Sequence, residues 1–135
     1  DLRGCELVDD TATRTEITRG VPDVVLAGAH AVFARSPEGA QNGGIPTSLG
    51  KPRSLGALTL GNLGGSIALV CSGVEIDRVA WSFGWPGQTG VAMQLDRLHF
   101  NSADNDLRAN WCAANPGYGS LGNRGSPGTL NPTCP

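Results

Sequence analysis

A series of short apolar segments that alternate with period two, separated by strong turn signals, limits the fold of this chain more than any other feature. Ile67, Leu69 and Cys71, for example, fall in phase with one another. Such alternation is typical of strands with one buried face. Separators such as GNLGG and FGWPGQTG are rich in Gly, Pro and Asn, which favour turns. No segment has apolar residues at helical spacing. The sequence therefore predicts an all-β fold, an antiparallel β-sandwich or small barrel, with strands near residues 5–9, 13–18, 29–35, 56–61, 66–71, 74–81 and 91–95.

In the segment VEIDRVAW the alternation changes phase, because Val79 and Trp81 share a phase that Ile76 does not. A β-bulge or the start of a new strand at Asp77–Arg78 would return these apolar side chains to one face. The phases together predict the core residues Leu7, Ile17, Val32, Leu58, Leu60, Ile67, Leu69, Ile76, Val79, Trp81, Met93 and Leu95.

Four cysteines, Cys5, Cys71, Cys112 and Cys134, occur without a C-x-x-C motif or a nearby histidine, which argues against a zinc site. An even count in a small, turn-rich chain favours two disulfides and a secreted, extracellular or cell-surface location. Three pairings are possible in principle. Because Cys5 and Cys71 are both in phase with core-facing strand residues, we expect them to pair across the sandwich core. Cys112 and Cys134 then pair with each other.

Charge and hydropathy limit the possible partners. The net charge is −2 and only 16% of residues are charged, so we expect no binding to nucleic acid or anionic membrane. No apolar run is long enough for a membrane span. The chain has neither a signal peptide nor an initiator Met, which indicates a processed or trimmed N-terminus.

Several motifs, taken in order, resemble those of the lamin tail domain family in its secreted bacterial branch. They are DLRGCELVDD, VVLAGAHAVFARS, LGALTLGNLGGSIALV, VEIDRVAW, and then MQLD, NWC, GSPGTLN and Cys134. The resemblance covers nearly the whole chain. It implies an immunoglobulin-like antiparallel β-sandwich over residues 1–99, with residues 100–135 as an ordered, disulfide-stapled, irregular tail on the same domain. It implies no catalytic residues and no cofactor.

The resemblance also implies that two strands usual in the family would precede Asp1. Either these strands were removed from the chain, or another polypeptide fills their place. A strand donated by another chain would satisfy an open sheet edge through main-chain hydrogen bonds. If the donor were an identical subunit, the contact would be head-to-tail and could build a filament.

Aromatic side chains are the candidates for a binding site. Trp85, Phe83 and Tyr118, with Trp81 and Trp111, could form a platform for sugar rings, whereas simple packing is the alternative. Trp85, in the loop GWPGQTG, is the one that we expect to be partly exposed, and an exposed tryptophan is typical of binding surfaces.

No metal site is predicted, although the turn formed by Asp104, Asn105 and Asp106 offers oxygen atoms suited to Ca²⁺. Asn115 stands where an EF-hand would place its bidentate glutamate, so capping of the local backbone is the preferred interpretation. His30 and His99 follow no nucleophile motif, and no catalytic residue is assigned.

These observations favour a non-enzymatic extracellular protein-contact module. It would serve as an attachment domain or as a subunit of a surface or filament assembly, with self-association by strand complementation as one route. A carbohydrate-binding module that uses exposed aromatic residues is the alternative, and an enzyme is the third class.

Overall fold

The computed structural model describes residues 1–17, 24–46, 52–119 and 122–135, and over these residues the fold is mostly β-structure. No α-helix occurs in these ranges, and no helix there is long and apolar enough to cross a membrane. The short 3₁₀ helices are η1 (Gly39–Gln41), η3 (Asp104–Asp106) and η4 (Arg108–Asn110). The strands are β1 (Cys5–Asp9), β2 (Arg14–Glu16), β3 (Phe33–Ala34), β4 (Arg53–Ser54), β5 (Gly65–Cys71), β6 (Val74–Trp81), β7 (Met93–Leu95), β8 (Trp111–Ala113), β9 (Gly117–Tyr118) and β10 (Asn123–Arg124).

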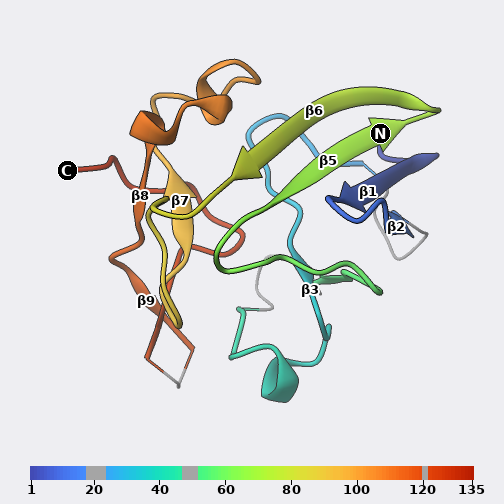
Figure 1. The fold of residues 1–135 in the computed structure, drawn as a ribbon. Coiled ribbons are helices and arrows are strands. Elements are labelled where there is room, and N and C mark those ends of the chain that lie inside the picture. The colour runs from blue at the N-terminus through green and yellow to red at the C-terminus, as the bar shows by residue number, and fades with distance from the viewer. Residues whose placement is uncertain (18–23, 47–51, 120–121) are drawn as a thin grey trace.

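The largest element is an antiparallel sheet with the strand order β2-β1-β5-β6 (Figure 1). The two-residue turn between β5 and β6 places both Ser72 and Gly73 at positive φ, 51° and 80°. This is the type I′ geometry, whose twist matches that of a tight antiparallel hairpin. The structure confirms the expected strands at 74–81 and 5–9. It also confirms the strand at 66–71, which begins one residue earlier, at Gly65.

A buried carboxylate closes the turn between β1 and β2. Asp9 Oδ1 accepts hydrogen bonds from the Thr11 N–H at 2.9 Å, the Thr11 hydroxyl at 2.7 Å and the Thr13 N–H at 3.0 Å. Its Oδ2 accepts one from the Thr59 N–H at 3.1 Å. Chiefly because of the Thr11 hydroxyl, the pKa of Asp9 is lowered from 3.8 to about 2. The ionised form of Asp9 thus ties the 56–61 segment to the sheet.

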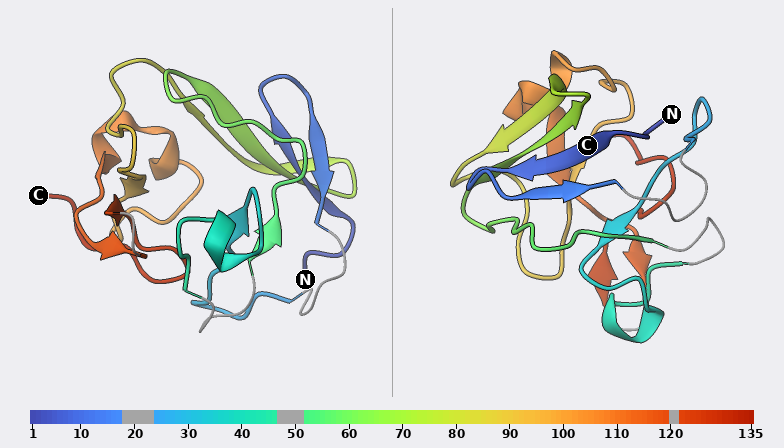
Figure 2. Two further views of the ribbon diagram at one scale, coloured as in Figure 1. Left: turned by 90° about the horizontal axis from the view of Figure 1, so that it is seen from below. Right: turned by 90° about the vertical axis from the view of Figure 1, so that its right-hand side faces the viewer.

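The remaining strands form three two-stranded sheets. β7 pairs with β8 and β9 with β10, both antiparallel, whereas β3 pairs with β4 in parallel. The parallel pair differs from the expected all-antiparallel arrangement. In the left view of Figure 2, β3, β4 and η1 lie on one side of the four-stranded sheet. That side is called the inner face of the sheet, and the opposite side is called its outer face.

The main core lies on the inner face, where Cys5, Leu7 and Ile17 pack with Leu58. Leu58 is only 1% exposed, although the expected strand at 56–61 is absent. A turn replaces it, in which the Leu58 N–H bonds to the Leu55 carbonyl. Because alternation does not continue through this turn, the prediction that Leu60 is buried is wrong, and its exposed fraction is 47%.

The predicted bulge in β6 is present, but it lies nearer the turn than expected. The register shifts between Leu69 and Val70, which pair with Asp77 and Glu75 and leave Ile76 as the additional residue. A bulge changes the direction of the side chains beside it. The prediction that Ile76 is a core residue is therefore wrong, and its exposed fraction is 53%.

Both expected disulfides are present. Cys5–Cys71 links residues that lie opposite each other on the neighbouring strands β1 and β5, with a Cα–Cα distance of 4.0 Å. The bond therefore joins two strands of one sheet, and the expectation that it crosses between two sheets was wrong. Cys112–Cys134 closes the C-terminal segment.

The described part of the segment 100–135 is largely irregular and is attached to the rest of the chain at several points. The Asn131 amide donates to the Leu95 carbonyl at 2.8 Å, and the Cys134 N–H donates to Asp96 Oδ2 at 2.8 Å. Asp96 Oδ1 also accepts from the Leu98 N–H, and these two backbone bonds lower the pKa of Asp96. Together with the β7–β8 pairing, these bonds hold the segment against residues 92–98.

Candidate functional site

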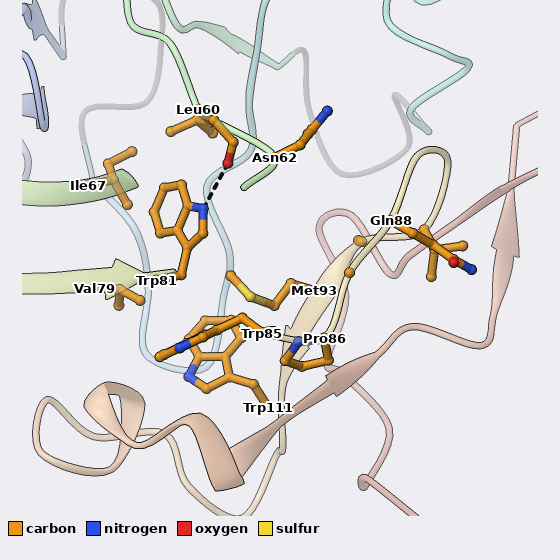
Figure 3. A pocket seen from close by; sticks show the side chains of 14 residues that line it. Leu60, Asn62, Ile67, Val79, Trp81, Trp85, Pro86, Gln88, Met93 and Trp111 are labelled. Carbon is orange, nitrogen blue, oxygen red and sulfur yellow. Dashed lines mark hydrogen bonds between the residues drawn. The ribbon is translucent and has the colours of Figure 1, made fainter. Parts of the chain in front are cut away.

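An open, mainly apolar groove of about 380 Å³ lies between the end of β6 and the β7–β8 pair (Figure 3). We call it the tryptophan groove, because all three tryptophans of the chain line it. Its lining consists of Leu60, Gly61, Asn62, Ile67, Val79, Trp81, Trp85, Pro86, Gly87, Gln88, Val91, Ala92, Met93 and Trp111. The volume lies at the lower end of the range for ligand sites.

Trp81 forms one wall and is fixed by two features of the sheet. It ends β6 directly opposite Gly65, where a side-chain Cβ would lie only 3.0 Å from the indole ring. Glycine at this position therefore makes room for the ring. The indole Nε1–H donates to the Gly61 carbonyl at 2.8 Å, so its polar atom is satisfied within the protein (Figure 3).

Trp85 and Trp111 form the opposite wall. Their ring centroids are 5.9 Å apart and the rings are tilted by 49°, a geometry that aromatic pairs favour. Trp111 begins β8, and its Nε1–H donates to the Asn105 carbonyl at 2.8 Å. Met93 lies between this pair and Trp81 (Figure 3). The three indoles thus line the walls of one open, apolar groove.

The loop that carries Trp85 is fixed by a cation outside the groove. The Arg108 guanidinium donates to the Gly84 carbonyl from Nε at 2.8 Å and from Nη2 at 2.5 Å. Gly84 has φ of 89°, a conformation that favours glycine. A turn bond from the Trp85 N–H to the Ser82 carbonyl completes the loop. Arg108 therefore positions Trp85 without lining the groove.

The groove is almost free of polar side chains. Among the described residues, its lining contains no charged side chain, and its polar side chains are the amides of Asn62 and Gln88. The Trp85 Nε1–H has no hydrogen-bond acceptor within the part of the chain that the structure describes. A ligand would therefore be held by apolar and aromatic contact, with a few groups available for orientation.

The aromatic residues singled out from the sequence are only partly brought together. Trp85 is half-buried and lines the groove, in the company of Trp81 and Trp111. Phe83 is 85% exposed but does not line the groove. Tyr118 lies in β9 and lines a separate concavity with Arg97. The five aromatic residues therefore do not form one platform.

The acidic turn forms η3, but its side chains point to different partners. Asp104 Oδ2 accepts from the Asn101 amide at 2.7 Å and contacts His99 Nδ1 at 3.2 Å, and these bonds, the first above all, lower the pKa of Asp104. The Asn105 amide instead donates to Asp77 on β6 at 2.7 Å. Over the described ranges, no group of three His, Cys, Asp or Glu side chains could hold a metal ion. Asp106 has no side-chain bond there, and His30 is exposed.

Several groove residues were assigned to the core from the sequence, among them Ile67, Val79 and Met93. They are half-buried because they face the groove. Pro86, Gln88 and Val91 were not identified. The Trp-Pro-Gly sequence beside them indicates a rigid aromatic loop, and it is the one local signal that points to this place.

Comparisons with protein families, with curated proteins and with solved structures find no match to this chain. The resemblance to the lamin tail family therefore remains a prediction. The geometry of the tryptophan groove is the basis for a functional proposal.

Proposed function

We propose that the chain is a non-enzymatic, extracellular protein-contact module and that the tryptophan groove is its contact site. One observation carries the proposal: three tryptophans border an open groove of about 380 Å³ whose lining, among the described residues, has no charged side chain. Tryptophan is enriched among the residues that dominate binding energy at protein interfaces, where it lies in well-packed, desolvated pockets. The two disulfides fit an oxidising, extracellular setting.

The groove suits an apolar side chain of a protein better than a sugar. A sugar presents many hydroxyl groups, and each needs a partner when it leaves water. The lining supplies two amide side chains for this purpose. In addition, Trp85 and Trp111 are tilted against each other by 49° and do not form a flat stacking surface.

The position of β6 supports the same interpretation. β6 is an edge strand of the four-stranded sheet, and its residues Val79 and Trp81 line the groove. No backbone bond from β6 to a strand other than β5 occurs within the described residues. A partner segment that added to this edge would place a side chain directly over the groove. This is the recognition mode in which main-chain bonds supply affinity and a pocket supplies specificity.

We further propose that the sheets form the two layers of an immunoglobulin-like sandwich of the lamin tail type. The supporting features are the order of the sequence motifs and the three expected strands of the main sheet. Such a module would act as an attachment domain or as a subunit of a surface assembly.

A binding screen with a matched pair of variants tests the function. The probes are a phage-displayed library of random linear peptides and a glycan array. The variants are Trp85→Ala, inside the groove, and Phe83→Ala, on the same loop but outside it. Circular dichroism and disulfide mapping would establish that both variants fold.

We expect the parent and Phe83→Ala to select peptides with a large apolar residue, and Trp85→Ala to lose them. Glycan binding that disappears in Trp85→Ala would overturn the proposal in favour of a carbohydrate-binding module. Peptide binding that is unchanged in Trp85→Ala would show that the groove is not the contact site.

A further inference from the structure

The outer face of the four-stranded sheet carries side chains in two rows that run across the strands. The register places Glu16, Glu6, Val70 and Glu75 side by side on β2, β1, β5 and β6. Residues directly opposite one another in a sheet share a face. The first row is therefore acidic on β2, β1 and β6 and apolar on β5.

The second row lies two residues further along each strand, about 6.8 Å away. It consists of Arg14, Val8, Ala68 and Arg78. On β6 the bulge brings Glu75 and Arg78 to the same face, although they are three residues apart. The second row is therefore basic at both ends and apolar in the centre. The two rows carry opposite charges on β2 and β6, whereas on β1 Glu6 of the first row corresponds to the apolar Val8 of the second.

The centre of this face is buried beneath its charged margins. Val8, Ala68 and Val70 form a small cluster of their own. Arg78 Nη2 pairs with Glu75 at 2.6 Å, and its Nη1 donates to Ser66 at 3.1 Å. At the other margin Arg14 pairs with Glu6. The side chains of both ion pairs keep substantial exposure, 41% for Arg78 and 56% for Arg14.

One feature of this face is unfavourable for an isolated chain. Glu16 lies directly opposite Glu6, and like charges in this position destabilise a sheet. Arg14 pairs with Glu6, and no cation pairs with Glu16 among the residues that the structure describes. A local conflict of this kind is typical of a functional surface, and an additional cation above Glu16 would relieve it.

We propose that this outer face binds the same face of a second copy of the chain. A two-fold axis in the plane of contact, lying midway between the rows and parallel to them, superposes the acidic row of each copy on the basic row of the other. Glu75 then meets Arg78 of the second copy, and Glu16 meets Arg14 of the second copy. A two-fold axis along the strands would instead bring the acidic rows together. Charge therefore selects one arrangement, with the strands of the two copies antiparallel.

The dimer is weak and depends on ionic strength. The central side chains are already below 9% exposure, so contact removes little more apolar surface from water. Two rows on four strands also cover less than the roughly 800 Å² per partner that a standard interface buries. Exposed charge pairs are screened at physiological salt, where the Debye length is about 8 Å. Association is therefore expected at low ionic strength and high protein concentration.

Two variants, each with one reversed charge, test the proposal when they are measured separately and as a mixture. Arg78→Glu alone sets Glu75 against the new glutamate of an identical copy, and Glu75→Arg alone sets Arg78 against a new arginine. In a mixed pair, every contact at this margin again joins opposite charges. The internal Glu75–Arg78 pair is lost in both variants and mixing does not restore it, so recovery on mixing reports contact between chains only.

The measurement is the dissociation constant from sedimentation equilibrium at low and high ionic strength. Each variant alone should dimerise at least about tenfold more weakly than the parent, because like charges across an interface cost several kcal/mol. The mixture should regain the parent constant. Arg124→Glu, on β10, changes the net charge of the chain as Arg78→Glu does and should leave the constant unchanged.

A parent that stays monomeric at low ionic strength would overturn the proposal, as would a mixture no tighter than its components. The tryptophan groove contains neither Glu75 nor Arg78. Peptide binding at the groove should therefore persist in both variants, so failure of the dimer and failure of the proposed contact function are separate results.

Discussion

Replacing Leu58 by alanine should cost about 3–4 kcal/mol of folding free energy, although Leu58 lies in a turn. It is 1% exposed and packs with Cys5, Leu7 and Ile17. The substitution removes three carbon atoms, worth about 2.4 kcal/mol at about 0.8 kcal/mol for each buried methylene. A cavity adds to this loss, because the disulfide-linked strands around it cannot fully collapse, and buried Leu→Ala changes cost about 2.7–5.0 kcal/mol.

Leu60→Ala is the matched control for this change. Leu60 has the same chemistry two residues further along and is 47% exposed, so about half of the transfer free energy, roughly 1 kcal/mol, is at stake. Urea denaturation with both disulfides intact gives the two losses, provided that the m-value stays constant. Similar losses for Leu58→Ala and Leu60→Ala would mean that both side chains face the core from a regular strand. That result would refute the turn and the core described above.

Three further changes test the buried carboxylate, the groove and the C-terminal staple. Because folding lowers the pKa of Asp9 from 3.8 to about 2, its ionised form stabilises the fold fully above about pH 4. That contribution to the free energy of unfolding is lost as pH falls towards 2. Asp9→Asn should therefore make the free energy of unfolding, measured by urea denaturation, depend less on pH below about pH 4. Arg108→Ala should shift and broaden the resonance of Trp85 among three 5-fluorotryptophan signals, and an unchanged spectrum would contradict its positioning role. Replacing Cys112 and Cys134 together by alanine should cost about 3 kcal/mol, from the loop entropy of a 22-residue separation, and should speed hydrogen exchange near the C-terminus; unchanged exchange would show that the tail is held without the staple.

The sequence predicts the main sheet well where alternation and turn chemistry agree. The segment 74–81 follows a Ser-Gly pair that accepts positive φ, and its apolar alternation then gives the strand bounds. The segment 56–61 has a similar Leu-x-Leu pattern, but Gly56 has φ of 57° and begins a turn. Alternation over so few residues cannot distinguish a strand from a turn that happens to bury its first leucine. The error at Leu60 follows from this ambiguity.

The candidate site was less accessible to sequence reasoning. Trp85 was identified because a tryptophan between turn residues has few ways to be buried. The groove, however, also needs Ile67, Val79, Met93 and Trp111, which come from four different segments. Phase correctly places Ile67, Val79 and Met93 on an inward face, whereas it was not applied to Trp111. Whether an inward face meets more core or an open groove depends on how the other sheets pack. No local pattern contains that information.

The bulge in β6 shows how one inserted residue can affect both faces of the sheet. In a strand without it, strict alternation from Val79 and Trp81 would direct residue 75 inward, and a glutamate there would lose its hydration without a partner. The extra residue Ile76 returns Glu75 to the outer face, beside Arg78, and leaves Val79 and Trp81 at the groove. The same insertion therefore keeps a charge out of the core and completes the charged margin of the outer face. Its cost is one apolar side chain left in solvent, which explains why a pattern of hydrophobic residues alone misplaced Ile76.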